Sequence, residues 1–427
     1  MKAVPIITLV LCALCSAQAA VINVPADQPT IQAGIDAAIA GDTVLVAAGS
    51  YIGVGNRDLE FRGRNIVVMS ASGATATTIN CQGSASEPHT AFWLHEAEDT
   101  SSVIDGFTVT GAYAKGAIMC STSVATVKNC VLQANNSNGI YCFEPWGGPY
   151  SAIPMRVTGC DISQSTGNGI WINNRPADIR RCRVYANDTS GIYCYATGQN
   201  SVFSQLLLAD NKNIGILIGE NLWGGAKVEN VTMVGNRVGL YVFSDFPKTG
   251  NSSKRPASDS TVIRNSIAAF NRSYGFLTWF TPPGTIGACN DSYGNDSANY
   301  MNMPFQAGDT LGNLSIDPLF CDRLAGDYHL SKESSCAPAN SSCHVLMGVY
   351  DVTCVCCKLT TGNVDGDPAD QVDISDLQAL IDNLFFSLPI TPCAAEADLD
   401  GSGSLDISDL QALIDHLFFG TPLPLCR

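Results

Sequence analysis

Two runs of oxygen-bearing side chains near the C-terminus have the spacing of ligands for a hard cation. The second run places oxygens at positions 1, 3, 5, 9 and 12 of a loop, on Asp398, Asp400, Ser402, Asp406 and Asp409. Gly403 stands at position 6, and the backbone carbonyl of Ser404 would supply position 7. This is the pattern of an EF-hand-type loop, in which Ca²⁺ binds six to eight oxygen atoms. We therefore predict a Ca²⁺ ion in this loop.

The first run has the same frame with two extra residues inside the loop. Its oxygens come from Asn363, Asp365, Asp367, Asp373 and Asp376. Both loops end in Asp, where an ordinary EF-hand has Glu. We predict a second Ca²⁺ ion here, with weaker binding, because a longer loop loses more conformational freedom when it closes.

Each loop leads into nearly the same phrase, VDISDLQALIDNLFF at 372–386 and LDISDLQALIDHLFF at 405–419. Its apolar residues recur at helical spacing, so each loop is expected to precede an amphipathic helix. Two such units in tandem resemble a type I dockerin over residues 362–427. The resemblance implies a cohesin-like protein partner, recognised through loop positions 10 and 11, which are Ile374, Ser375, Ile407 and Ser408. Since the copies are nearly identical, the partner could dock on either of two equivalent faces.

A second repeat fills the middle of the chain. Its phrase recurs as NGIYC (138–142), NGIWI (168–172), SGIYC (190–194), IGILI (214–218), VGLYV (238–242) and YGFLT (274–278), most often 22–24 residues apart. The strands alternate with period two, and units this small must stack to bury their apolar faces. We predict a mostly β fold, a right-handed parallel β-helix of about 22–24 residues per rung, followed by the small α-helical calcium-loop module. Larger steps indicate a rung with an added loop, at 144–154 and 244–260.

The two ends of this repeat region resemble those of secreted proteins of the pectin-lyase-like superfamily. The resemblance lies in the opening segment 22–51 and the closing segment 313–343, and it covers roughly residues 21–350. It implies a helix within residues 29–40 that covers the first rung, followed by the strand TVLV. It implies the fold more than an activity, because the superfamily includes lyases, glycosidases, epimerases and non-enzymes.

Cysteines interchange with aliphatic residues in the inward columns of the repeat. One column reads Ile118, Ile140, Ile170, Ile192, Ile216, Leu240 and Phe276, a second Cys120, Cys142, Ile172, Cys194, Ile218 and Val242, and a third Phe107, Cys130, Cys160, Cys182, Leu206 and Val231. We expect these cysteines to be buried free thiols, although neighbours such as Cys130 and Cys160 lie close enough in the stack to cross-link. Eight C-terminal cysteines are instead expected to form disulfides: Cys321, Cys336, Cys343, Cys354, Cys356, Cys357, Cys393 and Cys426.

An aromatic column is expected on the outside of the coil. The residue between two inward positions points outward, and down the stack it reads Met119, Tyr141, Trp171, Tyr193, Leu217, Tyr241 and Leu277. Trp146 and Trp223 stand in the adjoining loops. Exposed rings at one-rung spacing suit a carbohydrate-binding surface. The alternative is that the loops at 144–154 and 244–260 fold over the column and bury it.

Pairs of carboxylates suited to glycoside cleavage are not evident. Glu144 and Glu220 follow the same strand three rungs apart, about 14 Å at 4.8 Å per rung, whereas hydrolysis needs two carboxyls about 5–9.5 Å apart. Asp161 lies one rung before Arg183 in one outward column, an arrangement more typical of a salt bridge than of a lyase site. The sequence therefore leaves open whether the protein is an enzyme.

Bulk properties limit the compartment and the partners. Residues 1–19 have the Lys2, apolar run and Ala-x-Ala order of a signal peptide, and no later run is long enough to span a membrane. Eleven Asp and one Glu in 361–427 account for most of the net charge of −16, which disfavours nucleic acid and anionic lipid as partners. We expect a β-helix over 20–345, a Cys-rich linker over 346–361 and the dockerin-like module over 362–427.

These features predict a secreted, polysaccharide-directed protein that is extracellular or attached to a cell surface. One alternative is a polysaccharide lyase or glycoside hydrolase carried by its docking module. The other is a non-catalytic carbohydrate-binding or adhesion protein with the same module.

Overall fold

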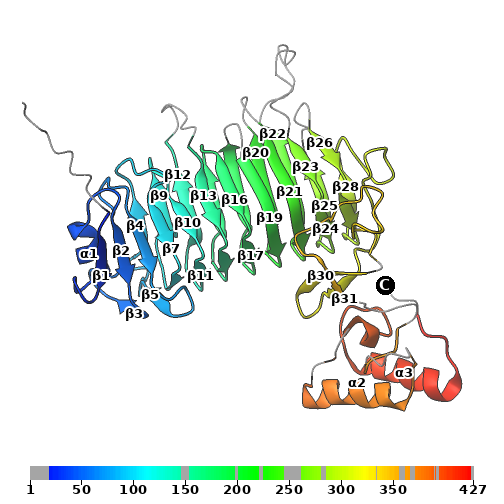
Figure 1. The fold of residues 1–427 in the computed structure, drawn as a ribbon. Coiled ribbons are helices and arrows are strands. Elements are labelled where there is room, and N and C mark those ends of the chain that lie inside the picture. The colour runs from blue at the N-terminus through cyan, green and yellow to red at the C-terminus, as the bar shows by residue number, and fades with distance from the viewer. Residues whose placement is uncertain are drawn as a thin grey trace, which may run out of the picture.

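The chain forms an elongated coil of short strands with a small helical module at its C-terminal end (Figure 1). The computed structural model describes residues 19–145, 153–197, 201–220, 225–244, 261–279, 285–332, 334–354, 361–365, 371–388, 390 and 394–424. The expected signal peptide therefore lies almost wholly outside the described residues. Among those that are described, no helix has the length and hydropathy needed to cross a membrane.

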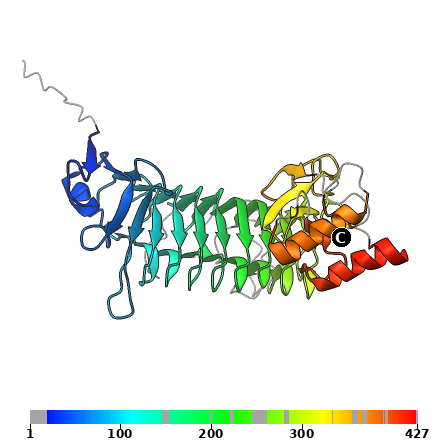
Figure 2. The same cartoon turned by 90° about the horizontal axis from the view of Figure 1, so that it is seen from below.

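One side of the coil is a nine-stranded parallel sheet, which we call the aromatic face. In spatial order its strands are β6 (Phe92–Leu94), β9 (Gly116–Ser121), β12 (Asn138–Phe143), β15 (Ile170–Asn173), β18 (Ile192–Thr197), β20 (Ile214–Glu220), β22 (Val238–Ser244), β25 (Tyr274–Thr278) and β28 (Ala298–Met301). The register pairs Ile140 with Ile170 and Leu240 with Phe276. The larger sequence intervals between repeats are therefore single rungs with added loops, as predicted. Successive rungs lie side by side along the coil (Figure 2).

The other two sides belong to one nineteen-stranded parallel sheet with two ladders. One ladder contains β1 (Val21–Val24), β2 (Thr43–Val46), β4 (Val67–Ser70), β7 (Val103–Asp105), β10 (Thr126–Lys128), β13 (Met155–Thr158), β16 (Ala177–Arg180), β23 (Val262–Arg264) and β26 (Ile286–Ala288). The other contains β3 (Gly49–Ile52), β5 (Thr77–Asn80), β8 (Thr108–Thr110), β11 (Val131–Gln133), β14 (Asp161–Ser163), β17 (Arg183–Tyr185), β24 (Ile267–Ala269) and β27 (Asp291–Tyr293). The long strands β19 (Ser201–Ala209) and β21 (Ala226–Val234) run through both ladders.

The interior consists of the predicted columns. Every member of the three inward columns is at most 1% exposed. Cys81, Cys120, Cys130, Cys142, Cys160, Cys182 and Cys194 are all buried and free, which confirms the expectation for the column members. The recurring glycine has a steric cause: a Cβ on Gly139 would lie 2.6 Å from the carbonyl oxygen of Gly169, one rung further on. Any side chain there would push adjacent rungs apart.

An asparagine stands three or four residues before most of the recurring glycines, and it has a structural role. Asn187, Asn211, Asn236 and Asn271 are fully buried, and each side-chain amide donates to the Oδ1 of the next asparagine at 2.8–3.3 Å, ending at Asn295. The ladder also satisfies backbone groups at the turn, since Asn236 donates to the Leu208 carbonyl. A buried polar side chain is stable only when its hydrogen bonds are made. The ladder therefore holds consecutive turns in register.

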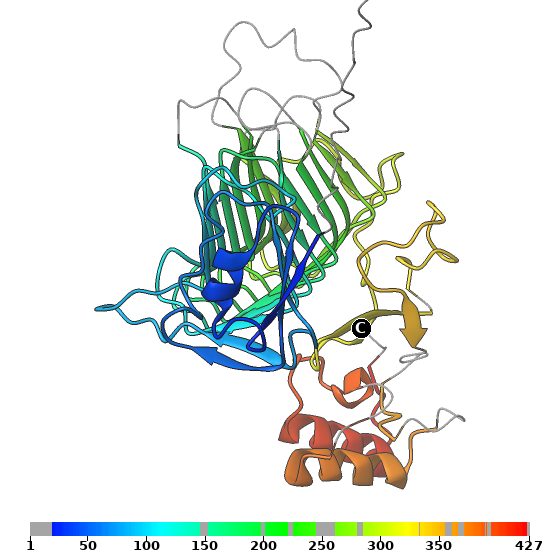
Figure 3. The same ribbon diagram turned by 60° about the vertical axis from the view of Figure 1, so that its left-hand side comes forward.

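The N-terminal end of the coil is covered by a short helix. Helix α1 (Ile31–Ala37) begins at Thr30, whose hydroxyl accepts a hydrogen bond from the Ala33 N–H, and it buries Ile31 and Ile35. It contacts β1 and β2 and covers the first rung (Figure 3). This agrees with the covering helix and the following strand implied by the sequence.

The last rungs are covered by a segment that the sequence expectations assigned partly to a linker. It contains the sheet β29 (Phe320–Asp322), β30 (Asp327–Ser331) and β31 (Val352–Cys354), with β29 antiparallel and β31 parallel to β30. Met347 is fully buried against the outer side of β24, and the Asn230 amide donates to the carbonyl of Leu346. Residues 346–354 are thus packed on the coil.

Two disulfides join this segment to itself and to the coil. Cys321 pairs with Cys354, and Cys343 pairs with Cys289, a cysteine outside the expected set of eight. The expectation for Cys336 was wrong: its thiol is buried and free, next to the Asp291 carboxyl. Cys356, Cys357, Cys393 and Cys426 lie outside the described residues. Cys354 is in a disulfide as expected, and its partner lies in the strand sheet.

The C-terminal module contains α2 (Ile374–Phe386), the 3₁₀ helix η3 (Ala394–Ala397) and α3 (Ile407–Phe419). The two long helices start in the same way. Asp373 and Asp406 are the N-caps, and each forms a capping box with the Asp three residues later. Leu380 and Leu413, at equivalent positions, are the fully buried leucines of the small core. The sequence repeat is thus a structural repeat.

Candidate functional site

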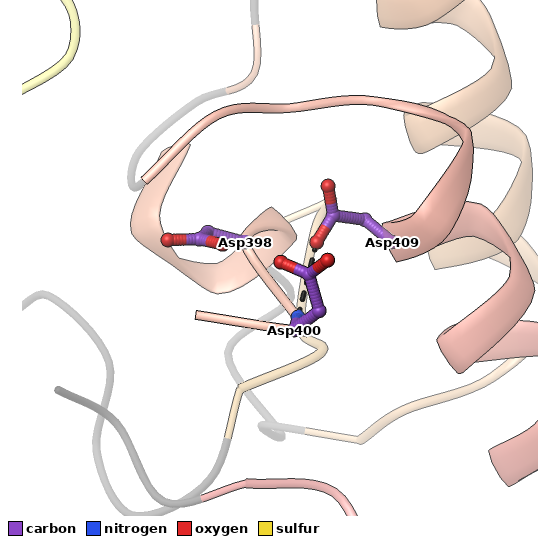
Figure 4. Close-up of side chains that lie close together, drawn as sticks. All are labelled: Asp398, Asp400 and Asp409. Carbon is purple, nitrogen blue, oxygen red and sulfur yellow. Dashed lines mark hydrogen bonds between the residues drawn. The ribbon is translucent and has the colours of Figure 1, made fainter. Parts of the chain in front are cut away.

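Three carboxylates of the second loop converge at the start of α3. Asp398, Asp400 and Asp409 each place one oxygen within 4.8 Å of the others (Figure 4). The fully buried Asp409 accepts hydrogen bonds from the N–H groups of Asp400 and Asp406 at 3.1 and 2.9 Å. Asp398 Oδ1 is buried and has no hydrogen-bond partner within the described part of the chain. Clustered carboxylates with an unpaired buried oxygen fit a hard cation, since each oxygen is a ligand type that Ca²⁺ prefers.

Electrostatics explains why this cluster would gain from a cation. Burial raises the pKa of Asp409, the neighbouring Asp400 and Asp398 charges raise it further, and the two backbone N–H groups oppose this shift. The other predicted ligands have partners of their own. Asp406 accepts from the Ser408 N–H, and Ser402 contacts the carbonyl and hydroxyl of Ser404. Of the five predicted side chains, the structure therefore brings three together.

The first loop has the same local geometry around its last aspartate. The buried Asp376 accepts from the N–H groups of Asp365 and Asp373 at 3.0 and 2.7 Å, as Asp409 does in the second loop. Asp373 accepts from the Ser375 N–H, and Asn363 is 7% exposed. Asp367 lies outside the described residues. The first loop can thus be compared with the second loop only at its two ends.

The predicted recognition residues lie on the surface of the module. Ile374 is 62% and Ile407 63% exposed, each followed by its serine in the first turn of a helix. The far ends of the helices expose the pairs Phe385–Phe386 and Phe418–Phe419, from 61% to 78%. Exposed aromatic residues of this size are unusual on an isolated surface and mark interaction sites. The sequence repeat signalled these phenylalanines, but the interpretation did not include them.

A cavity of about 500 Å³ separates the second loop from the end of the coil. Phe270 and Arg323 line it from the coil and closing segment, and Asp398 and Ser402 line it from the loop. The Arg323 guanidinium lies 4.5 Å from the centre of the Phe270 ring. The second loop therefore faces the coil, next to a cation.

The aromatic column exists as predicted, but its rings stack on one another. Tyr141 and Trp171 are paired in register, with ring centroids 4.5 Å apart and planes 3° apart, and Tyr193 follows at 6.2 Å. The rung spacing of about 4.8 Å is close to a stacking distance, so neighbouring rings cover each other's faces. Leu217 is 7% exposed, and Tyr241 is partly buried. The column thus presents ring edges outward, while Trp146 and Trp223 lie outside the described residues.

A second aromatic column stands two residues later on the same strands. Phe143 and Tyr195 belong to it, and Phe243 packs against both Tyr195 and Tyr241 with centroids 5.7 and 5.4 Å apart. Trp279 follows at the end of β25 and is 68% exposed. Sequence reasoning missed this column, although the period of two along a strand places it on the same side.

The candidate carboxylates of the coil are held in ion pairs. Glu144 is paired with Arg175, whose side chain is 5% exposed. Asp161 and Arg183 are register partners with their charged atoms 3.8 Å apart, which confirms the predicted salt bridge. The Glu220 side chain lies outside the described set. Neither ion pair supplies an unpaired carboxylate for acid–base chemistry.

Comparison with known proteins agrees with the observed coil. The model of the family described as "Right handed beta helix region" matches residues 65–254 and 150–286, together more than half of the chain. The chain belongs to this right-handed β-helix family. Handedness and stacking are thus as predicted from the repeat.

A solved pectate lyase structure has a similar fold. Pectate lyase Pel9A is 16% identical, with a TM-score of 0.53 over 78% of this chain and 96% of that chain. The A-module of mannuronan C-5 epimerase AlgE6 from Azotobacter vinelandii is 17% identical, with a TM-score of 0.37 over 64% of this chain and 70% of that chain. No curated protein sequence matches. At these identities the similarity shows the fold of this β-helix and no activity.

Proposed function

We propose that this β-helix protein is exported, is directed to a polysaccharide along its coil, and docks through its C-terminal module onto a cohesin-like partner. The polysaccharide part is supported by the similarity to pectate lyase Pel9A. It is also supported by two outward aromatic columns, the second of which ends in the exposed Trp279. Export is supported by residues 1–19, whose composition is typical of a signal peptide.

The docking part depends on calcium, and one observation carries it. Asp398, Asp400 and Asp409 converge within 4.8 Å at the start of one of two near-identical helices. Calcium-bound loops would hold the first turns of α2 and α3 in place. They would thereby position the exposed residues Ile374 and Ile407, which a partner would contact. Since ligand binding and loop order are linked, calcium affinity is partly folding free energy.

Calcium titration of the full chain by calorimetry tests this part. We expect two bound ions in the wild type and one in Asp409→Ala, with the site of the first loop retained. Asp376→Ala is the matched variant, and it should remove the other ion. Asp415→Ala, on the exposed side of α3, is the control and should leave both ions bound. Calcium binding by both loop variants at the wild-type stoichiometry would contradict the proposal.

Activity and binding are tested together with a panel of pectins, alginates and plant glycans. Appearance of unsaturated products or reducing ends would assign a lyase or a hydrolase. Retention of a glycan without products would assign a non-catalytic binding protein, which the ion pairs of Glu144 and Asp161 favour. Neither products nor retention with any glycan would contradict the polysaccharide assignment.

A further inference from the structure

Three consecutive turns of the coil carry an exposed cation at the same place. Lys212, Arg237 and Arg272 each follow one member of the asparagine ladder, and all three are exposed. Backbone hydrogen bonds connect these turns: the Arg237 N–H donates to the Asn213 carbonyl and the Arg272 N–H to the Asn236 carbonyl, both at 2.7 Å. The rigid ladder therefore fixes the cations at one-rung spacing, about 4.8 Å per rung. We call these residues the cation column.

The side chain of Arg272 reaches the turn at the other end of the cation column. Arg272 Nη2 donates to the backbone carbonyl of Asn211 at 2.9 Å, although Asn236 lies between them in the ladder. Its guanidinium thus reaches back past the turn of Arg237 to the turn of Lys212. A guanidinium held by one carbonyl still has donors for another acceptor.

The acids nearby only partly balance this charge. At one end, Lys212 Nζ lies 2.8 Å from Asp188 Oδ1. At the other end, Asp296 occupies the next turn, and Asp210 is near enough to Arg272 for the guanidinium to lower its pKa, against the larger effect of burial. The central Arg237 side chain, by contrast, has no ion pair or hydrogen bond with any residue that the structure describes. Like charges on adjacent rungs repel each other, so an anion bound between them would lower the energy of the column.

A mostly buried apolar cluster borders the cation column on the same rungs. Ile214, Leu217 and Val238 form an outer cluster with the partly buried Tyr274 and Tyr241. Ile214 and Val238 stand within two residues of Lys212 and Arg237 along the chain. Cations beside partly exposed tyrosine rings suit a sugar polymer with acidic substituents, because sugar rings have apolar faces and the substituents are charged.

We propose that the cation column binds the acidic groups, carboxylate or sulfate, of a linear polysaccharide that runs along the coil axis. The inference rests on the proposed polysaccharide function and adds the place and the charge of the ligand. Arg237 makes the central contact, Arg272 is positioned by the Asn211 carbonyl, and Lys212 exchanges Asp188 for the ligand. Duplex nucleic acid also carries regular anions, but the net charge of −16 opposes such a partner.

Affinity electrophoresis of the full chain through gels containing dextran sulfate, polygalacturonate or neutral dextran tests the site. We expect retardation by one or both anionic polymers and none by neutral dextran. Arg237→Gln should weaken retardation about tenfold, and the double variant with Lys212→Gln should abolish it. Arg264 is an exposed arginine in β23, outside the cation column. Arg264→Gln is therefore the matched control and should bind like the wild type. Thermal unfolding of every variant checks that the fold is unchanged.

The contrary outcomes separate this inference from the proposed function. Equal retardation of Arg237→Gln and Arg264→Gln would overturn the cation column as a site. Retention of neutral glycans alone would overturn it while the polysaccharide function stands, and retention of no glycan would remove both. Duplex DNA binding of equal strength, lost in Arg237→Gln, would overturn the assignment of the ligand as a polysaccharide. Salt should weaken specific binding steeply, since each paired anion releases counterions.

Discussion

Asp291 is a carboxylic acid buried where the last rungs meet the closing segment. Its side chain is fully buried, and its Oδ1 accepts a hydrogen bond from the Ile316 N–H at 3.1 Å. Burial raises its pKa to about 7, the negative charge of Asp317 adds to the rise, and the Ile316 N–H opposes it. Burial outweighs these hydrogen bonds, so the carboxyl is held best in its neutral form. This residue should therefore connect the stability of the closing segment to pH.

Stability should fall as pH rises from about 4 to about 7. In that window the unfolded chain, with an Asp pKa of about 3.9, has lost the proton that the folded chain still binds. The effect is at most about 4 kcal/mol at 1.36 kcal/mol per pKa unit. Asp291→Asn should remove this slope and raise stability at pH 8, as measured by urea unfolding at several pH values. Asp296→Asn, on an exposed turn, is the control, and an unchanged slope in Asp291→Asn would contradict the prediction.

At the scale of elements, repeated hydrogen bonds decide how well the rungs stay in register. Asn236 accepts from the Asn211 backbone and side chain at 3.1 and 3.0 Å, and it donates to the carbonyls of Leu208 and Val234 at 2.8 and 3.1 Å. Each turn of the ladder thus depends on its neighbours. Removing one side chain leaves buried polar groups without partners on two adjacent turns.

Asn236→Ala should therefore destabilise the coil by about 3 kcal/mol or more, since each unsatisfied buried group costs about 1–3 kcal/mol. Chemical unfolding measures the change in free energy, and hydrogen exchange should show it at the turns of Asn211 and Asn271. Asn213→Ala, a neighbour outside the ladder, should change stability by less than about 0.5 kcal/mol. Equal effects of the two substitutions would contradict a specific role for the ladder.

At the scale of the whole molecule, the closing segment connects the coil to the C-terminal module. It is tied to the coil by the disulfide between Cys289 and Cys343, 54 residues apart, and by hydrogen bonds from Asn230 to the carbonyls of Leu346 and Gly348. The second loop of the module faces this end of the coil across the cavity beside Arg323. The module is thus positioned through a segment that is itself fixed to the last rungs.

Replacing both Cys289 and Cys343 with Ser should loosen the closing segment first. A cross-link over 54 residues reduces unfolded-chain entropy by an amount worth about 4 kcal/mol. We expect a lower unfolding temperature. Mass spectrometry of protease digests should show new cleavage within 314–350, while the early rungs stay protected. Cleavage that begins in the N-terminal rungs, or an unchanged unfolding temperature, would contradict this prediction.

The repeat alone determined the coil, its inward columns and the duplicated helix starts of the module. In a stacked coil each rung contacts the next, so the period and the position of the glycine identify spatial neighbours such as Ile140 and Ile170. The candidate metal site was predictable for a similar reason, because its ligands lie within one short loop. The convergence of Asp398, Asp400 and Asp409 needed only local geometry.

Only the tertiary structure decided the features that depend on orientation or on distant segments. The outward position of Trp171 follows from the period, but its ring faces Tyr141 because the rung spacing matches a stacking distance. The pairing of Cys289 with Cys343 and the packing of Met347 join parts of the chain that share no repeat. Likewise, Arg272 reaches the turn of Lys212 through the direction of its side chain. A periodic sequence specifies neighbouring rungs, whereas contacts made by an aperiodic segment depend on where the folded coil ends.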